Sequence, residues 1–178
     1  LGTVGLRWGE AAALRVRDID VTRNRISIER NAVTVGTEVV IGTPKTHEVR
    51  EVAVPASVMR MLIPVMEGKS PDELLWPRRD GSPMKPPTHG KWYYNALDRC
   101  MDKYPDFPRV TPHGLRHVAA GLMVSAGANV KVIQRELGHS SAAMTLDIYA
   151  ELFDEDLEAV GSAVDEKISD VVRLSLIH

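Results

Sequence analysis

The stretch that decides the fold is residues 111–150, TPHGLRHVAAGLMVSAGANVKVIQRELGHSSAAMTLDIYA. Thr111-Pro112 is typical of a helix start, since a side-chain cap is followed by proline at the first helical position. This start predicts a helix to about Ser125. Asn129 predicts a cap for a second helix, to about Leu137. A third helix is expected to follow from residue 140 or 141.

Upstream of this stretch, residues 25–55 change to short runs of β-branched residues. The runs RISIERNAVTV, TEVVIG and REVAVP are separated by Gly36 and by residues 42–46. This pattern predicts a three-stranded antiparallel meander. Other helices are expected over residues 4–14, 55–68, 88–103 and 154–169. Residues 77–88 are expected to form an exposed loop. The expected fold class is α+β, predominantly α-helical with a small three-stranded antiparallel sheet.

Composition limits the kind of protein that this chain can be. With 178 residues, 44% of them apolar, it can bury one ordinary core, so a single globular domain is expected. No apolar run approaches the roughly 20 residues that span a bilayer, and no secretory leader is visible. We therefore expect a soluble, cytoplasmic protein without a membrane partner. The lone Cys100 favours neither an internal disulfide nor a zinc site. The start at Leu1, directly before a helical pattern, suggests a fragment.

Charge is distributed unevenly along the chain. The formal net charge of −2 argues weakly against nucleic-acid binding, because phosphate contacts need lysine and arginine. Residues 1–150, however, carry 20 Lys/Arg against 16 Asp/Glu, whereas residues 151–178 carry 2 against 8. An acidic tail therefore masks a mildly basic body.

Polar groups collect at the predicted helix ends. His113 and Arg116 share the first turn of one helix, where backbone N–H groups favour an anion such as phosphate. The alternative for this pair is structural, with His113 capping or packing and Arg116 pairing with a surface carboxylate. His139 ends the next helix, and Tyr149 follows it by ten residues.

In order and spacing, these motifs make the chain resemble the tyrosine recombinases of the phage-integrase type. That family's signature is His-x-x-Arg, then Leu-Gly-His, then a tyrosine, and here it reads HGLRH, LGHSS and TLDIYA. The family also has an arginine in a Gly-x-Arg-x-x-Glu context, seen here as GLRWGE, and a lysine in a hairpin turn, seen here as TPKT. The catalytic residues that the resemblance implies are Arg7, Lys45, His113, Arg116, His139 and Tyr149. It covers residues 4–150 and implies that residues 1–178 form a catalytic domain without its N-terminal core-binding domain.

The implied chemistry explains why these residue types are needed. A phosphodiester gathers negative charge as it approaches a pentacovalent transition state, so donors aimed at its nonbridging oxygens accelerate the reaction. Arg7 and Arg116 suit that role because guanidinium groups stay charged and offer forked donors. By resemblance, His113 and His139 add hydrogen bonds to the same phosphate. Whether His113 also takes the tyrosine proton is open.

Tyr149 is the implied nucleophile. Its attack leaves a 3′-phosphotyrosyl intermediate and a free 5′-hydroxyl, and the reverse attack reseals the strand without ATP. Lys45 is the candidate general acid for the leaving 5′-oxygen. No cofactor and no metal are expected, because the arginines supply the charge that Mg²⁺ would otherwise provide. A zinc site on the histidines is disfavoured, since His113 and His117 have helical spacing without an acidic partner.

Further residues are assigned supporting roles. Glu10 is expected to orient or neutralise a neighbour, and His117 to brace its helix. The residues that could contact the DNA backbone are Lys91, Arg109, Lys131 and Arg135. Trp8, Trp76 and Trp92 are expected in the core or at an interface. Three other tyrosines compete with Tyr149, but none stands one helical segment beyond a Gly-His pair: Tyr93, Tyr94 and Tyr104.

The resemblance favours site-specific DNA recombination, that is integration or excision. Two alternatives remain: DNA relaxation by a type IB topoisomerase, and a DNA-binding module without activity. The implied partners are double-stranded DNA, a homotetramer on DNA in the full-length protein, and accessory DNA-bending factors. The acidic helix in residues 151–178, with an apolar stripe at Leu157, Val160 and Val164, either folds back or packs into a neighbouring protomer.

Overall fold

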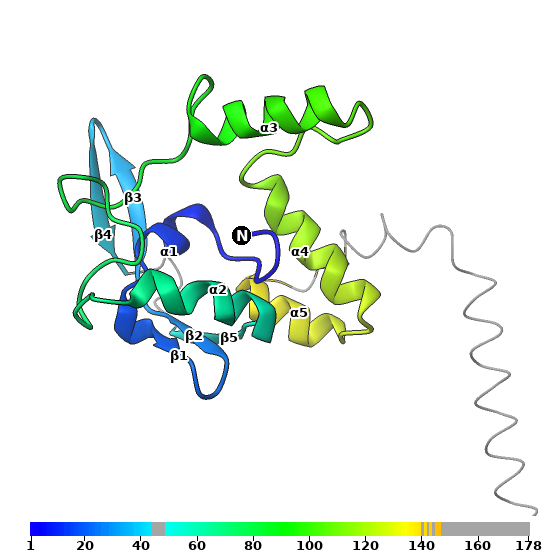
Figure 1. The fold of residues 1–178 in the computed structure, drawn as a ribbon. Coiled ribbons are helices and arrows are strands. Elements are labelled where there is room, and N and C mark those ends of the chain that lie inside the picture. The colour runs from blue at the N-terminus through cyan, green and yellow to red at the C-terminus, as the bar shows by residue number, and fades with distance from the viewer. Residues whose placement is uncertain (44–48, 140, 142, 144, 147–178) are drawn as a thin grey trace, which may run out of the picture.

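The computed structural model describes residues 1–43, 49–139, 141, 143 and 145–146. Helices and short antiparallel strands build an α+β domain (Figure 1). The helices are α1 (Trp8–Ala12), the 3-10 turn η1 (Val16–Asp18), α2 (Ala56–Met66), α3 (Trp92–Lys103), α4 (Gly114–Ser125) and α5 (Val130–Leu137). The strands are β1 (Ile19–Asp20), β2 (Arg25–Ile28), β3 (Asn31–Val35), β4 (Glu38–Gly42) and β5 (Arg50–Ala53). None of the helices that the structure describes is long and apolar enough to cross a bilayer.

The strands pair differently from the predicted meander. A three-stranded antiparallel sheet exists, but its order is β1-β2-β5, and β3 and β4 form a separate two-stranded hairpin. Ile26 of β2 pairs with Val52 of β5, a neighbour that is distant in sequence. The meander was wrong because strand periodicity identifies which residues are extended but says little about which strands pair. The β3–β4 hairpin is inserted in the chain between β2 and β5, which are neighbours in the sheet.

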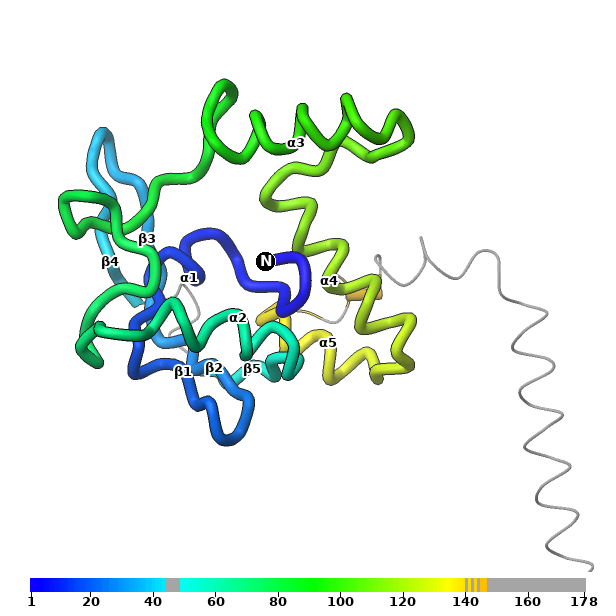
Figure 2. Tube along the Cα trace, viewed as in Figure 1, coloured from blue at the N-terminus to red at the C-terminus, as the bar shows by residue number. Residues whose placement is uncertain are grey.

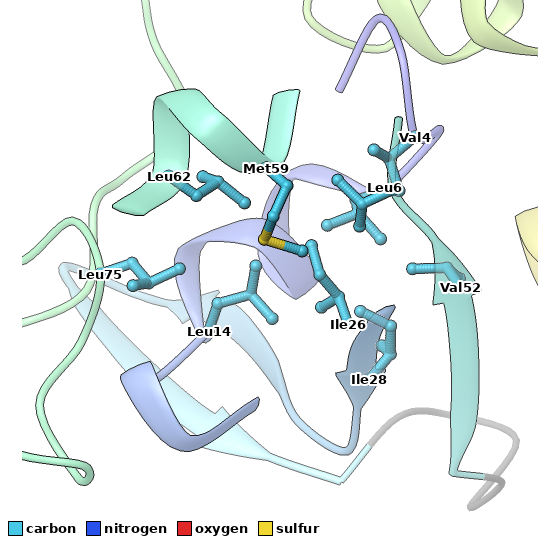
Figure 3. Packing of buried hydrophobic residues seen from close by; sticks show 10 residues of the cluster. Val4, Leu6, Leu14, Ile26, Ile28, Val52, Met59, Leu62 and Leu75 are labelled. Carbon is cyan, nitrogen blue, oxygen red and sulfur yellow. The ribbon is translucent and has the colours of Figure 1, made fainter. Parts of the chain in front are cut away.

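A first apolar core lies between this sheet, α1 and α2 (Figure 3). Its members alternate along the strands or recur at helical spacing, which is how one face of each element becomes apolar. They are Val4, Leu6, Leu14, Ile26, Ile28, Val52, Val54, Met59, Leu62 and Leu75. A second, smaller core joins α4 to α5 through Ala120, Val124, Ile133 and Leu137.

The N-terminal segment contributes Val4 and Leu6 to the first core, and in the tube view it runs between α1 and α4 (Figure 2). Gly5 adopts a left-handed conformation with φ +75°, and a Cβ there would lie 2.4 Å from the side chain of Leu137. Only glycine permits so close an approach of this segment to α5. The junction brings the residues around position 7 against the end of α5.

Of the predicted helix starts, that of α5 agrees with the structure, that of α4 lies two residues too early (Pro112 instead of Gly114), and two others differ. Thr111 Oγ1 accepts a hydrogen bond from the backbone N–H of Gly114 at the start of α4, and the Asn129 side chain caps α5. The first helix is shorter than predicted, covering only Trp8–Ala12. Helix α3 begins at Trp92 rather than near Thr88, because Gly90 takes a left-handed turn with φ +74° just before it.

The three tryptophans line one cavity of about 190 Å³ together with Ala11, Ala12 and Met84. The indole of Trp8 donates a hydrogen bond to the carbonyl of Met84, 3.2 Å away. Trp92 is 55% exposed, so the cavity opens at the first turn of α3. The predicted helix over residues 154–169 lies outside the described residues.

Candidate active site

Arg116 is buried at the start of α4, with 5% of its surface exposed. Its guanidinium donates hydrogen bonds to the backbone carbonyls of Gly5 and Leu137, so it joins the N-terminal segment to the end of α5. Burial and then the charge of Arg7 lower the pKa of Arg116 to about 10, which still leaves the group protonated at neutral pH. Arg116 is therefore a fixed, buried positive charge.

Arg7 immediately precedes α1 and is held from two directions. Its side chain donates to the Glu10 carboxylate at 2.9 Å and to the carbonyl of Gly138 at 2.8 Å. Its own backbone N–H donates to the other Glu10 oxygen at 2.8 Å, which caps the helix because Glu10 stands at its third position. The side chain is 42% exposed, so Arg7 can still reach a ligand.

Glu10 is the buried carboxylate of this cluster, with 2% of its side chain exposed. Arg50, the first residue of β5, donates a hydrogen bond to each of its two carboxylate oxygens, at 2.9 and 2.8 Å. Burial would raise the pKa of Glu10, but the hydrogen bonds and charges of Arg50 and then Arg7 outweigh it and hold the pKa below its usual range. Glu10 is therefore ionised and shared between two guanidinium groups.

The three arginines converge on three consecutive carbonyls at the end of α5. Arg50 donates to Glu136, Arg116 to Leu137 and Arg7 to Gly138. The last carbonyls of a helix have no partner within it and carry the negative end of its dipole, so cations are favoured there. The end of α5 thus gathers side chains from three distant parts of the chain, directly before His139.

His139 is half-buried, and its Nδ1 lies 2.9 Å from the hydroxyl of Thr145, a fully buried residue. Burial and then the charges of Arg116 and Arg7 lower the pKa of His139 to about 4. The imidazole is therefore neutral at physiological pH. A neutral imidazole carries one N–H, so the partner of Nδ1 determines what Nε2 can do.

His113 and His117 lie on the exposed side of the α4 start. Their rings are in edge contact, with centroids 5.4 Å apart. Burial and then electrostatic interactions with His117, Arg116 and Arg7 lower the pKa of His113. His113 and Arg116 share one helix start, but only Arg116 is buried.

Two of the implied catalytic residues, Lys45 and Tyr149, lie outside the described residues, as does the acidic segment 151–178. The residues expected to contact the DNA backbone are all exposed: Lys91, Arg109, Lys131 and Arg135. Of the competing tyrosines, Tyr93 donates its hydroxyl to the carbonyl of Val110 at 2.7 Å, and Tyr104 is 54% exposed.

Two residues of the site were missed by the sequence interpretation. Arg50 had a usable signal, since it shares a strand face with the buried Val52 and Val54, and a charge on an apolar face needs a buried partner. Thr145 had none, because nothing in its local sequence indicates a hydrogen bond with His139.

The cluster has an excess of positive charge. Three guanidinium groups face one carboxylate, and the two histidines beside them are held toward the neutral form. Such a partly buried excess is unfavourable unless an anion completes it. Within the part of the chain that the structure describes, no group of three or more His, Cys, Asp or Glu side chains could hold a metal ion. The arrangement is suited to binding a phosphate group and stabilising charge on its oxygens.

Comparison of the sequence with known proteins finds relatives of this chain. The chain is 25% identical over 174 residues to the ICEBs1 integrase of Bacillus subtilis, an alignment that covers 91% of this chain and 46% of that protein. It is 29% identical over 183 residues to the integrase of Mycobacterium phage L5, covering 98% and 47%. The chain thus spans less than half the length of these curated relatives.

Solved structures share the fold. The Tn1549 transposon integrase, in complex with circular intermediate DNA, matches with a TM-score of 0.77 at 23% identity, covering 93% of this chain and 57% of that one. XerA recombinase matches with a TM-score of 0.59 at 20% identity, covering 88% and 55%. The fold is therefore that of a tyrosine recombinase catalytic domain, as predicted. A model of the phage integrase family matches residues 1–156, and the chain belongs to this family.

Proposed function

We propose that this chain is the catalytic domain of a site-specific DNA recombinase that breaks and rejoins strands through a 3′-phosphotyrosyl intermediate. The observation that carries the proposal is the convergence of Arg7, Arg50 and Arg116 on the end of α5 around a single carboxylate. This excess charge matches the phosphodiester that the chemistry requires. Family membership and the DNA in the Tn1549 integrase structure support the same substrate class.

In the proposed reaction each side chain has a distinct task. Arg7 and Arg116 bind the nonbridging oxygens of the scissile phosphate, and His113 and His139 add neutral hydrogen bonds. Tyr149 attacks the phosphorus, its proton leaves to His113 or solvent, and Lys45 protonates the departing 5′-oxygen. One phosphodiester replaces another, so neither ATP nor a metal enters the balance.

The wider assignments follow from this function. Lys91, Arg109, Lys131 and Arg135 would contact the backbone of double-stranded DNA, and His117 would brace the helix that carries His113. A core-binding domain in a longer protein would complete the clamp around DNA. Four protomers would exchange strands, with residues 151–178 packing either in cis or in trans and with DNA-bending factors assisting. The protein would then act at the nucleoid.

A trapping assay on the full-length protein tests the proposal. The substrate is duplex DNA that carries the recombination site and a nick beside it, so that the short fragment released by cleavage diffuses away and the strand cannot be resealed. This DNA should form a covalent complex with the protein, and Tyr149→Phe should abolish it. Tyr104→Phe is the matched control, since that tyrosine is exposed and has no role in the proposed reaction. It should leave capture unchanged. Capture that survives Tyr149→Phe would exclude this nucleophile.

The same protein separates the alternatives. Strand exchange between two duplexes that carry the site supports recombination. Relaxation of any supercoiled plasmid without exchange would indicate a type IB topoisomerase, and binding without covalent capture a silent DNA-binding module.

A further inference from the structure

Arg50 is a charged residue on a face of the sheet that is otherwise apolar. It begins β5, and the alternation of the strand places it on the same face as Val52 and Val54, which belong to the first core. Only 12% of its side chain is exposed. A guanidinium at such a position is stable only if its charge and its donors are satisfied locally.

The local partners of Arg50 fix its guanidinium in one orientation. Two parallel hydrogen bonds of 2.9 and 2.8 Å join it to Glu10, and its Nε donates to the carbonyl of Glu136 at 3.3 Å. The plane also lies against Gly138, where a Cβ would come within 2.9 Å of the guanidinium carbon. Lysine could keep the charge but could not make this forked contact.

Glu10 has two tasks that conflict electrostatically. It holds Arg7 through both the side chain and the backbone N–H, and by doing so it brings a full negative charge to one of the two arginines proposed to bind phosphate. Without a second cation, this carboxylate would cancel the charge of Arg7. Arg50 supplies that cation from the buried side.

We propose that Arg50 is a positioning residue, which compensates Glu10 so that the carboxylate can hold Arg7 in place without cancelling the positive charge offered to the DNA phosphate. This inference rests on the proposed function. Arg50 itself does not touch DNA in this proposal, because both of its terminal nitrogens are paired with the Glu10 carboxylate and its Nε with the carbonyl of Glu136.

Four variants of the full-length protein test this charge relation. Arg50→Gln removes the compensating cation, Arg50→Lys keeps charge without the fork, Glu10→Gln removes the carboxylate, and Glu10→Gln/Arg50→Gln removes both. Arg23→Gln is the matched control, because Arg23 pairs with Glu51 on the exposed edge of the same sheet, and it should change nothing beyond twofold. Each variant is assayed for covalent capture of nicked DNA, for DNA affinity and for its denaturant midpoint.

The single variant should lose most of the rate of covalent capture, and the double variant should regain part of it. Arg50→Gln should slow covalent capture by about 10- to 100-fold while changing DNA affinity less than about threefold, since a positioning defect appears in the chemical step. Arg50→Lys should fall between this variant and the wild type. The double variant should recover about tenfold of the loss, because its net charge equals that of the wild type and no buried charge is left unpaired.

Two results would overturn the proposal. A folded double variant as slow as Arg50→Gln would mean that charge compensation is not the role. A loss of DNA affinity as large as the loss of capture, with a weaker dependence on salt, would mean that Arg50 contacts DNA directly. If Arg50→Gln fails to fold, the double variant still decides the matter, because it contains no uncompensated buried charge.

Inorganic sulfate separates this inference from the proposed function. Sulfate should raise the melting temperature of the wild type and the double variant more than that of Arg50→Gln, whatever happens with DNA. Equal sulfate stabilisation of all three would contradict the role of Arg50. If sulfate raises the melting temperatures as expected but covalent capture of DNA does not depend on Tyr149, the proposed recombination is contradicted and the role of Arg50 in anion binding is not.

Discussion

At the scale of single residues, the orientation of His139 depends on one hydroxyl. Thr145 is fully buried, and a buried hydroxyl hydrogen needs an acceptor. Within the part of the chain that the structure describes, the contact at 2.9 Å to Nδ1 of His139 is the hydrogen bond that its hydroxyl makes. If the hydroxyl donates, the neutral ring carries its proton on Nε2 and can donate to a phosphate.

Replacement of this hydroxyl gives a residue-scale prediction. Thr145→Val keeps the shape but removes the hydrogen bond, and should slow covalent capture of nicked DNA by about 10- to 100-fold, less than the roughly 100- to 1000-fold that follows removal of an oriented donor itself. Thr145→Ser restores the hydroxyl and should stay within a few fold of wild type. Imidazole ¹⁵N spectra provide a second measurement, with Nδ1 unprotonated in the wild type. A protonated Nδ1 there would contradict the assigned tautomer.

At the scale of elements, the end of α5 organises the site. Its carbonyls at Glu136, Leu137 and Gly138 accept from three arginines, and the left-handed Gly138 then turns the chain toward His139. Helix α5 is only eight residues long, so its end is held by these contacts more than by the helix itself. A change at Gly138 should therefore affect stability and chemistry together.

The stability cost of a side chain at Gly138 can be measured against Gly127, a glycine with a similar φ angle. Gly127 follows α4 with φ +76° and open space around it, whereas Gly138 has φ +62° and the Arg50 guanidinium against it. Gly127→Ala should cost only left-handed strain, about 1–2 kcal/mol. Gly138→Ala should cost a further ~1–3 kcal/mol from overpacking. Urea unfolding compares the two, and equal losses would show that Arg50 moves aside without cost.

The elements also mark where sequence patterns were sufficient. Asn129 identified the start of α5, and Thr111 lies three residues before the start of α4, because a cap is a local interaction of three or four residues. The β1-β2-β5 pairing was not predictable in this way. Residues 31–35 read as a continuation of the strand that begins at Arg25, and residues 37–42 as the second strand of the same sheet, whereas in the structure these two segments form the separate hairpin β3–β4.

At the scale of the whole molecule, acid should destabilise the protein. The pKa of His139 is about 4 in the folded state against an ordinary 6.5, so between these values the unfolded chain binds a proton that the folded chain does not. Stability is then lost as the pH falls through this window. Glu10 acts in the same direction, since its lowered pKa means that its contribution is lost when the carboxylate is protonated.

Denaturant midpoints at pH 7.5, 6 and 5 check this expectation. The wild type should lose stability steadily, and His139→Gln should lose less of it between pH 7.5 and 5, because glutamine does not titrate. An identical pH dependence in the two proteins would show that His139 does not contribute.

The segregation of charge gives a further prediction for DNA binding. Residues 1–150 carry a positive excess and residues 151–178 a negative one. This chain alone should bind duplex DNA weakly, with affinity that falls steeply between 50 and 200 mM salt, as expected for phosphate contacts. Tight binding that persists at high salt, measured by fluorescence anisotropy, would contradict an electrostatic interface. In the full-length protein, removal of residues 152–178 should impair cooperative assembly on DNA if the tail packs in trans.

The sequence by itself determined the fold class, the cap of α5, and the order of Arg7, His113, Arg116 and His139, because each depends on spacing along the chain. Only the tertiary structure decided that Arg50 and Thr145 belong to the site and that Glu10 is shared between two arginines. Arg50 lies 40 residues from Glu10 and 86 from Glu136, and Arg7 lies 131 from Gly138. Contacts over such separations depend on how two cores pack around the N-terminal segment, and no local pattern records them.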